Sequence, residues 1–577
     1  MSVGVGGDVP QKGDLTSVEV FTTIASVKEG NYNYNVMIRS KAIVAVVGVA
    51  AALCSFAENW YVSETGDDNN DGKSWETAFR RLTKPCGRNL YGNGIATAGD
   101  TVWVEDGYEC SAANGDSAMG VIPSTGSKTA MVIVQAGVTL RSRSGDWRTG
   151  AVIRGGGNLC LCLVAGASAI GFQCMDGGST SASYGGVYGT DRATCVVSNC
   201  LVTACSTKDY YKDICNVQGA QIYNCVITNN VNTVLHNCDV FNSTIANGTC
   251  SLVGGYSTAA SGTSVMLDHC VISNFVAEPI IKGNCRLAAC ELLCNTGVLV
   301  QVYSVLDGCT ISGNWRETAT EQAKGLIGGG CVLSNCTLTA NTTRYTGTGG
   351  KGFTGGCLFG SDVRAVNCRI TQNTLGGVYT ASANYYGVVG ENAHFENCFV
   401  ADNSVPNGGN YIRSGTACNS VFVHTNQALN AMCLNTKLCN VTIYGNCRSY
   451  PGATTNSICW NVTTGQCGDP ASSYIKWTEK PAPVNSCSAR AADDTTGTSF
   501  STAPGLDMDI TSRTFLMPLK NSPCIDKCTG DYAFAWMTDP ADPRSKDVYR
   551  HRRVIGAAAD IGALECCPAQ GLQVIFR

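Results

Sequence analysis

One short pattern of hydrophobic and polar residues recurs along the chain: cysteine or valine, any residue, a branched aliphatic residue, two further residues and asparagine. Because positions i and i+2 of a strand share a face, the cysteine and the aliphatic residue are predicted to point inward, with residues such as Thr310 pointing outward. Asparagine tolerates left-handed backbone and is predicted to end each short strand. The copies are CVITNN at 225–230, CTISGN at 309–314, CTLTAN at 336–341, CRITQN at 368–373, CFVADN at 398–403, VFVHTN at 421–426, VTIYGN at 441–446 and the shorter CVISN at 270–274.

The copies follow one another at intervals of about 20 to 45 residues, a period typical of solenoids. The intervals from Cys225 to Cys270 and from Cys270 to Cys309 have room for two coils each, and Cys238 and Cys290 lie within them in similar surroundings. Gly-Gly pairs between the copies, such as 185–186 and 376–377, favour corners. Helical periodicity is nearly absent, so helices do not cover a parallel sheet here.

These features predict an all-β fold, a right-handed parallel β-helix built as a single-stranded solenoid. The alternatives are a chain of β-sandwiches, which would show hairpin signals every 8–12 residues or so, and a propeller with its own period of about 40–50. The strand pattern fits neither as well. We predict an N-terminal cap with the first coils over 58–155, β-helix repeats over 156–495, a C-terminal closing segment over 496–565 and a tail over 566–577.

Residues 37–57 have the order of a secretory signal peptide: Arg39 and Lys41 precede an apolar stretch over 42–53, and small residues at 55 and 57 suit cleavage. Residues 1–36 would then precede the true start and not belong to the native protein. The alternative is an uncleaved membrane anchor. We expect a secreted protein, or one on the outer cell surface, that meets a membrane only through this signal or anchor.

The composition of the chain narrows the range of possible binding partners. The 577 residues are 44% hydrophobic and only 15% charged, with a net charge of −4, so no basic field attracts nucleic acid. Of the 34 cysteines, Cys54 lies in the signal peptide, which leaves an odd number that cannot all pair within one molecule. We favour buried free thiols for the repeat cysteines; the alternative is disulfides in an oxidising compartment.

Both ends of the chain resemble secreted bacterial proteins of the pectate-lyase-like parallel β-helix class. The resemblance is carried by WYVS at 60–63, GDDNNDGKSW at 66–75, GDTVWVEDGY at 99–108, SPCID at 522–526 and, with Arg553, DIGALE at 560–565. The Asn-Cys and Gly-Gly units between them are similar to the repeats of polymorphic outer membrane proteins. The resemblance implies the β-helix fold but is a poor guide to activity, since a fold of this kind hosts many functions. The partner that we expect is an extracellular polysaccharide or a cell-surface glycan.

Asp67, Asn69 and Asp71, followed by Gly72, match the first half of a calcium-binding loop, with oxygen ligands at alternate positions. Ala78 stands where an EF-hand has its bidentate glutamate. We favour a polar turn that caps the first strand and keep calcium as the alternative, the one cofactor the sequence indicates.

A polysaccharide lyase needs acidic groups and a lysine or arginine stacked across neighbouring coils. Asp268 and Asp307 lie two residues before a repeat cysteine, and His236 and Glu396 occupy the same frame. In other copies the position two residues before the cysteine is occupied by Ser334, Val366 or Tyr223, a mixture expected of a solvated surface.

Aromatic residues in the irregular inserts are the candidate glycan-binding residues, because loops commonly carry function. Their alternative role is to cover hydrophobic edges. The sequence thus favours a noncatalytic glycan-binding or adhesive surface protein. The alternatives are a lyase or hydrolase acting on an acidic polysaccharide and a structural envelope component. The aromatic candidates are Tyr210, Tyr211, Trp315, Tyr345, Tyr385 and Tyr386.

Overall fold

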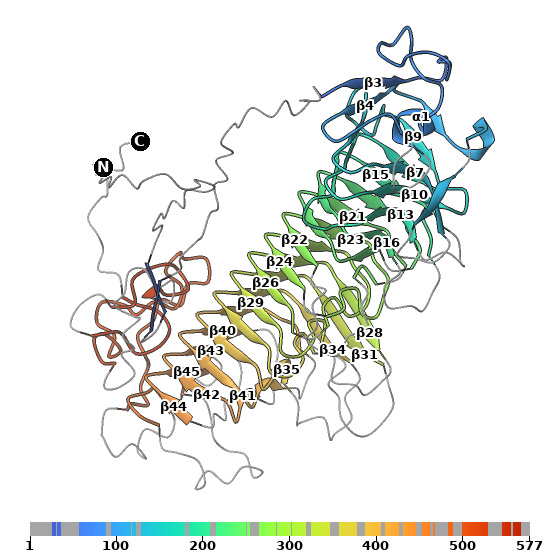
Figure 1. The fold of residues 1–577 in the computed structure, drawn as a ribbon. Helices are drawn as coiled ribbons and strands as arrows, with labels where there is room; N and C mark the ends of the chain where they lie inside the picture. Colours follow the sequence, from blue (N-terminus) through green and yellow to red (C-terminus); the bar gives the residue numbers. More distant parts are fainter. Residues whose placement is uncertain are drawn as a thin grey trace, which may run out of the picture. The chain divides into compact units, whose positions relative to one another are not determined.

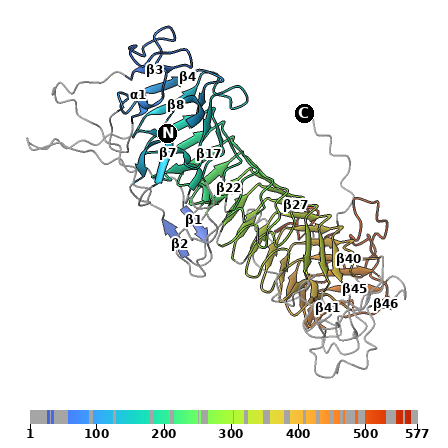
Figure 2. The ribbon, with the colours of Figure 1, turned by 90° about the vertical axis from the view of Figure 1, so that its right-hand side faces the viewer.

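The computed structural model shows a right-handed parallel β-helix whose coils stack one on the next (Figure 1). The same coils are seen from the side in Figure 2. Parallel pairing between successive coils excludes the β-sandwich alternative, whose strands pair as antiparallel hairpins. The structure describes residues 26–29, 32–35, 57–87, 94–116, 118–122, 128–178, 184–207, 215–232, 234–249, 251–253, 265–283, 285–301, 303–318, 325–346, 357–377, 387–405, 410–425, 431–445, 453–461, 466–467, 483–487, 499–528, 545–554 and 558–566.

Residues 1–56 and 57–577 form two compact units. In the first, β1 (Ser26–Glu29) and β2 (Tyr32–Asn35) pair as an antiparallel hairpin, a strand pair that the sequence pattern did not predict. Apart from Ala57, the predicted signal peptide lies outside the described residues. Within the described parts of the chain, no helix has the length and apolar character needed to cross a membrane.

One long side of the β-helix, here called the first sheet, has sixteen parallel strands. In spatial order they are β3 (Asn59–Val62), β4 (Thr101–Val104), β8 (Thr139–Ser142), β11 (Ser168–Ile170), β14 (Val196–Ser198), β17 (Gln221–Tyr223), β20 (Asp239–Phe241), β22 (Met266–Asp268), β24 (Arg286–Ala288), β26 (Val305–Asp307), β29 (Val332–Ser334), β32 (Arg364–Val366), β36 (His394–Glu396), β39 (Thr416–Cys418), β42 (Lys437–Cys439) and β44 (Ala453–Thr455).

The second sheet also has sixteen strands. From the N-terminal end they are β5 (Glu109–Cys110), β9 (Val152–Arg154), β12 (Gln173–Met175), β15 (Leu201–Thr203), β18 (Val226–Thr228), β21 (Thr244–Ala246), β23 (Val271–Ser273), β25 (Glu291–Leu293), β27 (Thr310–Ser312), β30 (Thr337–Thr339), β33 (Arg369–Thr371), β37 (Phe399–Ala401), β40 (Val421–His424), β43 (Thr442–Gly445), β45 (Ile458–Asn461) and β46 (Gln466–Cys467). Only β46, at the C-terminal end, pairs antiparallel to its neighbour in this sheet.

Shorter sheets make up the third side of the coils. Two short helices, α1 (Thr83–Cys86) and the 3-10 helix η1 (Ala112–Asn114), lie near the N-terminal end. The third-side strands are β6 (Met119–Ile122), β7 (Lys128–Val134), β10 (Leu159–Leu163), β13 (Tyr184–Gly189), β16 (Cys215–Gln218) and β19 (Leu235–His236), then β28 (Trp315–Thr318), β31 (Thr342–Tyr345) and β34 (Thr374–Gly377), and β35 (Gly387–Glu391), β38 (Asn410–Arg413) and β41 (Ala431–Leu434).

The corner between the first and second sheets places the repeat cysteines inside, as predicted. A left-handed residue, such as Asn335 with φ 55° or His269 with φ 52°, turns the chain, and the next residue points into the core. The two long intervals do hold two coils each, with Ser243 and Cys290 taking the corner places. Six successive coils thus form a thiol ladder with each side chain at most 2% exposed: Cys270, Cys290, Cys309, Cys336, Cys368 and Cys398.

Each ladder thiol donates a hydrogen bond to a main-chain carbonyl of the preceding coil. For example, Cys336 Sγ lies 3.5 Å from Leu306 O and Cys398 Sγ lies 3.3 Å from Ala365 O. Among the described cysteines no disulfide is formed, which agrees with the free-thiol prediction for the repeats. A thiol suits this place because it is small and apolar and still donates a hydrogen bond.

In the copies that end at Asn230, Asn314, Asn341, Asn373 and Asn403, the asparagine has a different role from the one predicted; Asn426 and Asn446, which end two further copies, lie outside the described residues. The residue before it adopts the left-handed conformation, as Ala340 does with φ 54°, and the asparagine itself is buried. Its amide donates to the asparagine of the next coil, with 2.9 Å from Asn341 Nδ2 to Asn373 Oδ1. A buried amide needs such partners, and the coil register supplies them. This asparagine ladder consists of Asn295, Asn314, Asn341, Asn373 and Asn403.

Three details of the predicted repeat pattern are wrong. In the shorter copy, Asn274 is itself the left-handed residue, so Phe275 takes the buried place. Ser420, not Val421, occupies the cysteine place, because the left-handed residue of that coil comes one position earlier than the pattern implied. Cys238 lies at the corner before the first sheet and not at the corner after it, because it precedes β20.

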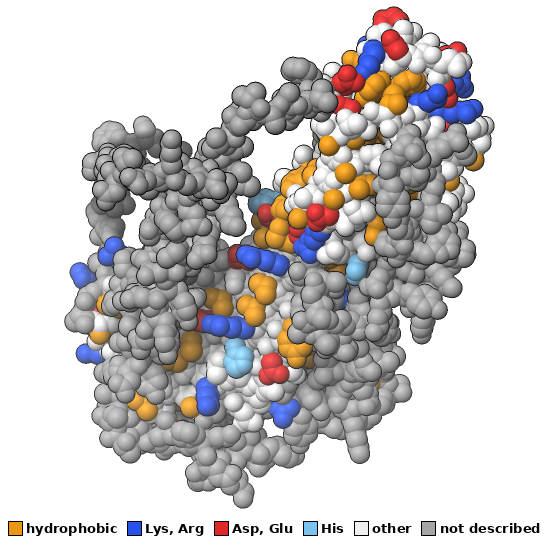
Figure 3. Space-filling view, viewed as in Figure 1, with side chains coloured by type: hydrophobic (Ala, Val, Ile, Leu, Met, Phe, Trp, Pro, Cys, Tyr) orange, Lys and Arg blue, Asp and Glu red, His pale blue; other side chains and the backbone are white. Residues whose placement is uncertain are grey.

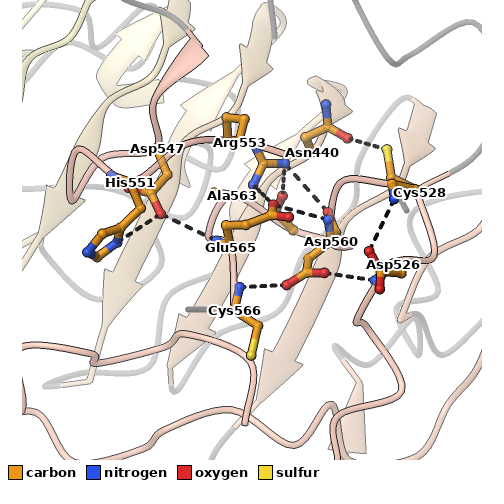
Figure 4. A network of polar contacts seen from close by, with 12 residues as sticks. Asn440, Asp526, Cys528, Asp547, His551, Arg553, Asp560, Ala563, Glu565 and Cys566 are labelled. Atoms are coloured by element: carbon orange, nitrogen blue, oxygen red, sulfur yellow. Dashed lines mark hydrogen bonds and ion pairs between the residues drawn. The ribbon is translucent and has the colours of Figure 1, made fainter. Parts of the chain in front are cut away.

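A polar network fixes the closing segment at the C-terminal end (Figure 4). Arg553 and Glu565 are fully buried, 3.5 Å apart, and Arg553 Nη2 donates to Gly562 O at 2.9 Å. Gly562 N in turn donates to Asn456 O at 2.8 Å, and Ala563 N donates to Thr442 Oγ1 at 3.0 Å. The residues that carry the C-terminal resemblance therefore attach this segment to the last coils.

Candidate functional site

The outward face of the first sheet presents side chains in continuous rows. The middle residue of most strands points inward, so the first and third residues point outward. The strand register aligns the third residues of all sixteen strands in one continuous row, which we call the outer row. The row runs Tyr61, Trp103, Arg141, Ile170, Ser198, Tyr223, Phe241, Asp268, Ala288, Asp307, Ser334, Val366, Glu396, Cys418, Cys439 and Thr455.

An aromatic–arginine cluster opens this row: Tyr61, Trp75, Trp103, Arg141 and Arg143. Arg141 lies 5.3 Å from the ring centroid of Trp103, and Arg143 lies 5.0 Å from that of Trp75. Tyr61 and Trp75 meet edge to face, with centroids 4.9 Å apart. Figure 3 shows charged and hydrophobic side chains gathered at this end of the β-helix, with charged side chains more sparse along the coils.

Buried Asp100 holds the strands beneath the cluster in place. Its carboxylate accepts hydrogen bonds from Trp60 Nε1 at 3.1 Å and from Glu58 N at 2.8 Å, which ties β3 to the start of β4. These and further hydrogen bonds more than offset burial, so the pKa of Asp100 is lowered, although desolvation alone is the largest single effect and acts to raise it. Because Asp100 fixes the register of β3 and β4, Tyr61 and Trp103 stand side by side.

The cluster can bind a polymer that carries carboxylates. Arginine holds carboxylates through paired N–H donors, and aromatic rings offer flat apolar surface with little conformational entropy to lose. Arg141 Nε is buried and has no hydrogen-bond partner among the described residues, and Arg143 is exposed. Three coils beyond Arg141, Tyr223 and Phe241 stack with centroids 4.8 Å apart and rings within 9° of parallel.

Register confirms that Asp268, Asp307 and Glu396 share one row, and it places His236 elsewhere, in β19 on the third side, since Cys238 is not a corner counterpart of Cys225. Each acid already has a partner. Asp268 Oδ1 lies 2.7 Å from His269 Nδ1, and Glu396 Oε2 lies 3.0 Å from Arg364 Nη2.

The spacing of the acids decides what chemistry they can share. Asp307 Oδ1 accepts from Asn335 Nδ2 at 2.9 Å. Asp268 and Asp307 are two coils apart, about 9–10 Å at the usual strand spacing, which lies at the outer limit for the carboxyl pair of inverting glycosidases, about 6.5–9.5 Å. Exposed Arg286 belongs to the coil between them.

Asp67, Asn69 and Asp71 form a polar turn, the structure favoured over calcium in the sequence analysis. Asp67 Oδ1 accepts from Asn69 N at 2.9 Å. Asp71 Oδ1 accepts from Thr77 Oγ1 at 2.6 Å and from Lys73 N at 3.0 Å, and the Thr77 hydrogen bond contributes most to lowering the pKa of Asp71. Within the described residues, no group of three or more acidic, cysteine or histidine side chains is arranged to hold a metal ion.

The predicted aromatic residues do not form one site. Trp315 is exposed, but it belongs to β28 on the third side. Tyr345 is 2% exposed, so its prediction as a surface residue is wrong: it ends β31, where alternation points it inward. The remaining candidates lie outside the described residues: Tyr210, Tyr211, Tyr385 and Tyr386.

Sequence reasoning missed the aromatic–arginine cluster. Its signal was the alternation in TVWV at 101–104 and TLRS at 139–142, where Trp103 and Arg141 occupy the outward positions. The cysteine frame, on which the search for stacked side chains relied, does not extend to these coils.

No protein-family model matches the chain, and no curated protein sequence matches it. Solved structures do. Pectate lyase Pel9A is 13% identical, over 89% of this chain and 97% of that one, with a TM-score of 0.21. A mannuronic acid specific polysaccharide family 6 lyase from human gut microbiota is 12% identical, over 68% and 87%, with a TM-score of 0.29. The tailspike protein of an E. coli bacteriophage, solved with a pentasaccharide, is 10% identical, over 67% and 70%, with a TM-score of 0.26.

At these identities the likeness concerns the fold alone. The chain has the right-handed parallel β-helix fold, which carbohydrate-active lyases, epimerases and glycan-binding tailspikes also have.

Proposed function

We propose that this protein binds an acidic polysaccharide along the outward face of the first sheet without cleaving it. The aromatic–arginine cluster carries this proposal, because it joins two guanidinium groups and three aromatic rings on one face. The acids further along that face are held by His269, Arg364 and Asn335, so they offer no free carboxylate pair for hydrolysis. If residues 37–57 act as the predicted signal peptide, the protein would act outside the cell or at its surface, where such polymers occur.

Rows that repeat once per coil suit an extended polymer. Neighbouring strands lie about 4.8 Å apart, so each coil presents one pair of outward side chains at a regular step. A chain lying along the helix axis would meet the cluster first and then the stacked pair Tyr223 and Phe241, with Arg286 beyond them.

The test is affinity electrophoresis and calorimetry of the full chain with polygalacturonate, alginate and neutral dextran. We expect binding to the two polyuronates and not to dextran. The double substitution Arg141→Gln and Arg143→Gln should weaken binding by at least about 100-fold, since two charged hydrogen bonds are lost and each is worth about 1.5–3 kcal/mol. Arg148→Gln is the matched control, because it also replaces an arginine of the N-terminal coils but one that lies outside the cluster, paired with Asp146. Equal binding by the double variant would refute the proposed site.

One observation favours a second function, a polysaccharide lyase: Arg286 lies in the coil between Asp268 and Asp307. In that case the two acids would bind the sugar and Arg286 would accept a proton. The same polyuronates, with calcium and with chelator, would then yield unsaturated ends that absorb ultraviolet light. If such ends form and Arg286→Gln abolishes them, the noncatalytic proposal is wrong.

A further inference from the structure

Two cysteines of the outer row differ from all members of the thiol ladder. Cys418 and Cys439 are direct partners in the parallel pair β39–β42, at outward positions of the first sheet. Both are partly exposed, whereas every ladder thiol is at most 2% exposed. An oxidant in solution can therefore reach this pair without entering the core.

The pair has the spacing of a disulfide. Paired residues of adjacent parallel strands have Cα atoms about 4.8 Å apart, within the roughly 4.4–6.8 Å that disulfides span. The main chain holds the two residues at this spacing, because Asn419 N, the amide next to Cys418, donates to Cys439 O at 3.0 Å. The two thiols are close enough for each to shift the pKa of the other.

That proximity also prepares the chemistry. The Cys439 thiol donates to the Cys418 sulfur and lowers the pKa of Cys418, because an S–H donor stabilises the thiolate. The same hydrogen bond raises the pKa of Cys439, which keeps its proton. Cys418 is thus the attacking sulfur and Cys439 the resolving one.

We infer that Cys418 and Cys439 are a modification site that closes to an inter-coil disulfide by exchange with a low-molecular-weight disulfide such as oxidised glutathione. The Cys418 thiolate attacks one glutathione sulfur, forms a mixed disulfide and releases glutathione thiolate, which takes the Cys439 proton. The Cys439 thiolate then attacks the Cys418 sulfur and releases the second glutathione thiolate, which is protonated from solvent by the proton that Cys418 gave up. The two cysteines lose two electrons and two protons, and oxidised glutathione becomes two thiols.

This inference does not rest on glycan binding, although the pair belongs to the same outer row. The alternative disulfide partner of Cys439 is Cys528 of the closing segment, which is close enough to Cys439 to influence its ionisation. Cys528 is 7% exposed, and its sulfur donates to Asn440 Oδ1 at 3.5 Å. A disulfide between Cys439 and Cys528 would tie the closing segment to the coils instead of tying two coils together.

The experiment treats the reduced full chain with oxidised glutathione, blocks free thiols with iodoacetamide and digests with trypsin without reductant. Trypsin cuts after Lys437, between the two cysteines, so the disulfide joins two peptides that mass spectrometry detects. Fragment ions assign the sulfurs, because each peptide contains a second cysteine. We expect a link between Cys418 and Cys439 that dithiothreitol reverses, and a higher melting temperature of the oxidised chain.

Two variants make the result specific. Cys439→Ser should accumulate the glutathione adduct on Cys418, because the resolving thiol is missing. Cys309→Ser, in the thiol ladder, should still form the disulfide between Cys418 and Cys439. If this variant does not fold, the peptide map of the oxidised wild-type chain alone tests the inference. A link from Cys439 to Cys528 would overturn the inference, as would equal alkylation of Cys418 and Cys439 with and without oxidised glutathione.

Discussion

Removing one member of the asparagine ladder should destabilise the β-helix strongly. In Asn341→Ala, Asn314 N loses its acceptor, Asn341 Oδ1 at 3.1 Å, and Ile311 O loses the amide donor, Asn341 Nδ2 at 2.9 Å. Asn314 N is then a buried donor without an acceptor, at about 1–3 kcal/mol, and Ile311 O and Asn314 Nδ2 each lose one of their hydrogen bonds, at about 0.5–1.5 kcal/mol each. We expect a loss of about 3–4 kcal/mol in the free energy of unfolding, near the middle of that combined range.

The matched control is Asn335→Gly, one coil corner away. Asn335 is exposed with φ 55°, and glycine adopts that conformation without strain; the variant loses only the exposed hydrogen bond to Asp307, so its free energy of unfolding should fall by no more than about 1 kcal/mol. Urea unfolding followed by far-ultraviolet circular dichroism gives both values, and hydrogen exchange at the Asn314 amide reports the local effect. The reasoning is refuted if Asn341→Ala is no less stable than Asn335→Gly, or if the Asn314 amide exchanges as slowly as in wild type.

Three further outcomes follow from the described contacts. The pKa of His551 is raised, chiefly by its hydrogen bond to Asp547. Protonated His551 therefore stabilises the folded chain fully below pH 6.5, and this stabilisation is lost as pH rises through the folded pKa. Melting temperatures measured against pH should show this loss in wild type and not in His551→Gln. Iodoacetamide at pH 8 should label exposed Cys294 well before Cys285, whose pKa burial raises to about 12, and peptide mapping over time will show any reversed order. Polyuronate binding should weaken steeply as sodium chloride rises from 50 to 500 mM or so, since exposed charge attraction is screened; salt-independent affinity would contradict the role of the arginines.

The β-helix was predictable because its repeat is set by short-range geometry. An inward cysteine, an aliphatic residue two places on and a turn residue recur whenever a coil passes the same corner, so one strand pattern reports every coil. The roles of adjacent asparagines were not predictable in the same way. In Asn229-Asn230, one residue turns the chain and the other is buried against Cys205 N at 3.0 Å, and the sequence alone does not distinguish them.

The candidate site was harder to predict, because its parts are far apart in the chain. Trp103 and Arg141 meet only because β4 and β8 are consecutive rungs, and the segment between them has no repeat that would reveal the pairing. The row of acidic residues could be predicted because each acid lies two residues before a repeat cysteine. The first coils lack the cysteine repeat, so their outward side chains could not be aligned from the sequence.

The closing segment also determines how the molecule meets its own copies. A stack of parallel coils ends in unpaired N–H and C=O groups, a template on which another chain could extend the sheet. Here β46 reverses direction against β45, and Gly562 and Ala563 occupy groups of the last coils. A chain cut after residue 461 would expose that edge, whereas residues 72–79 cover the opposite edge at β3, so its expected fate is dimers joined through two exposed C-terminal edges.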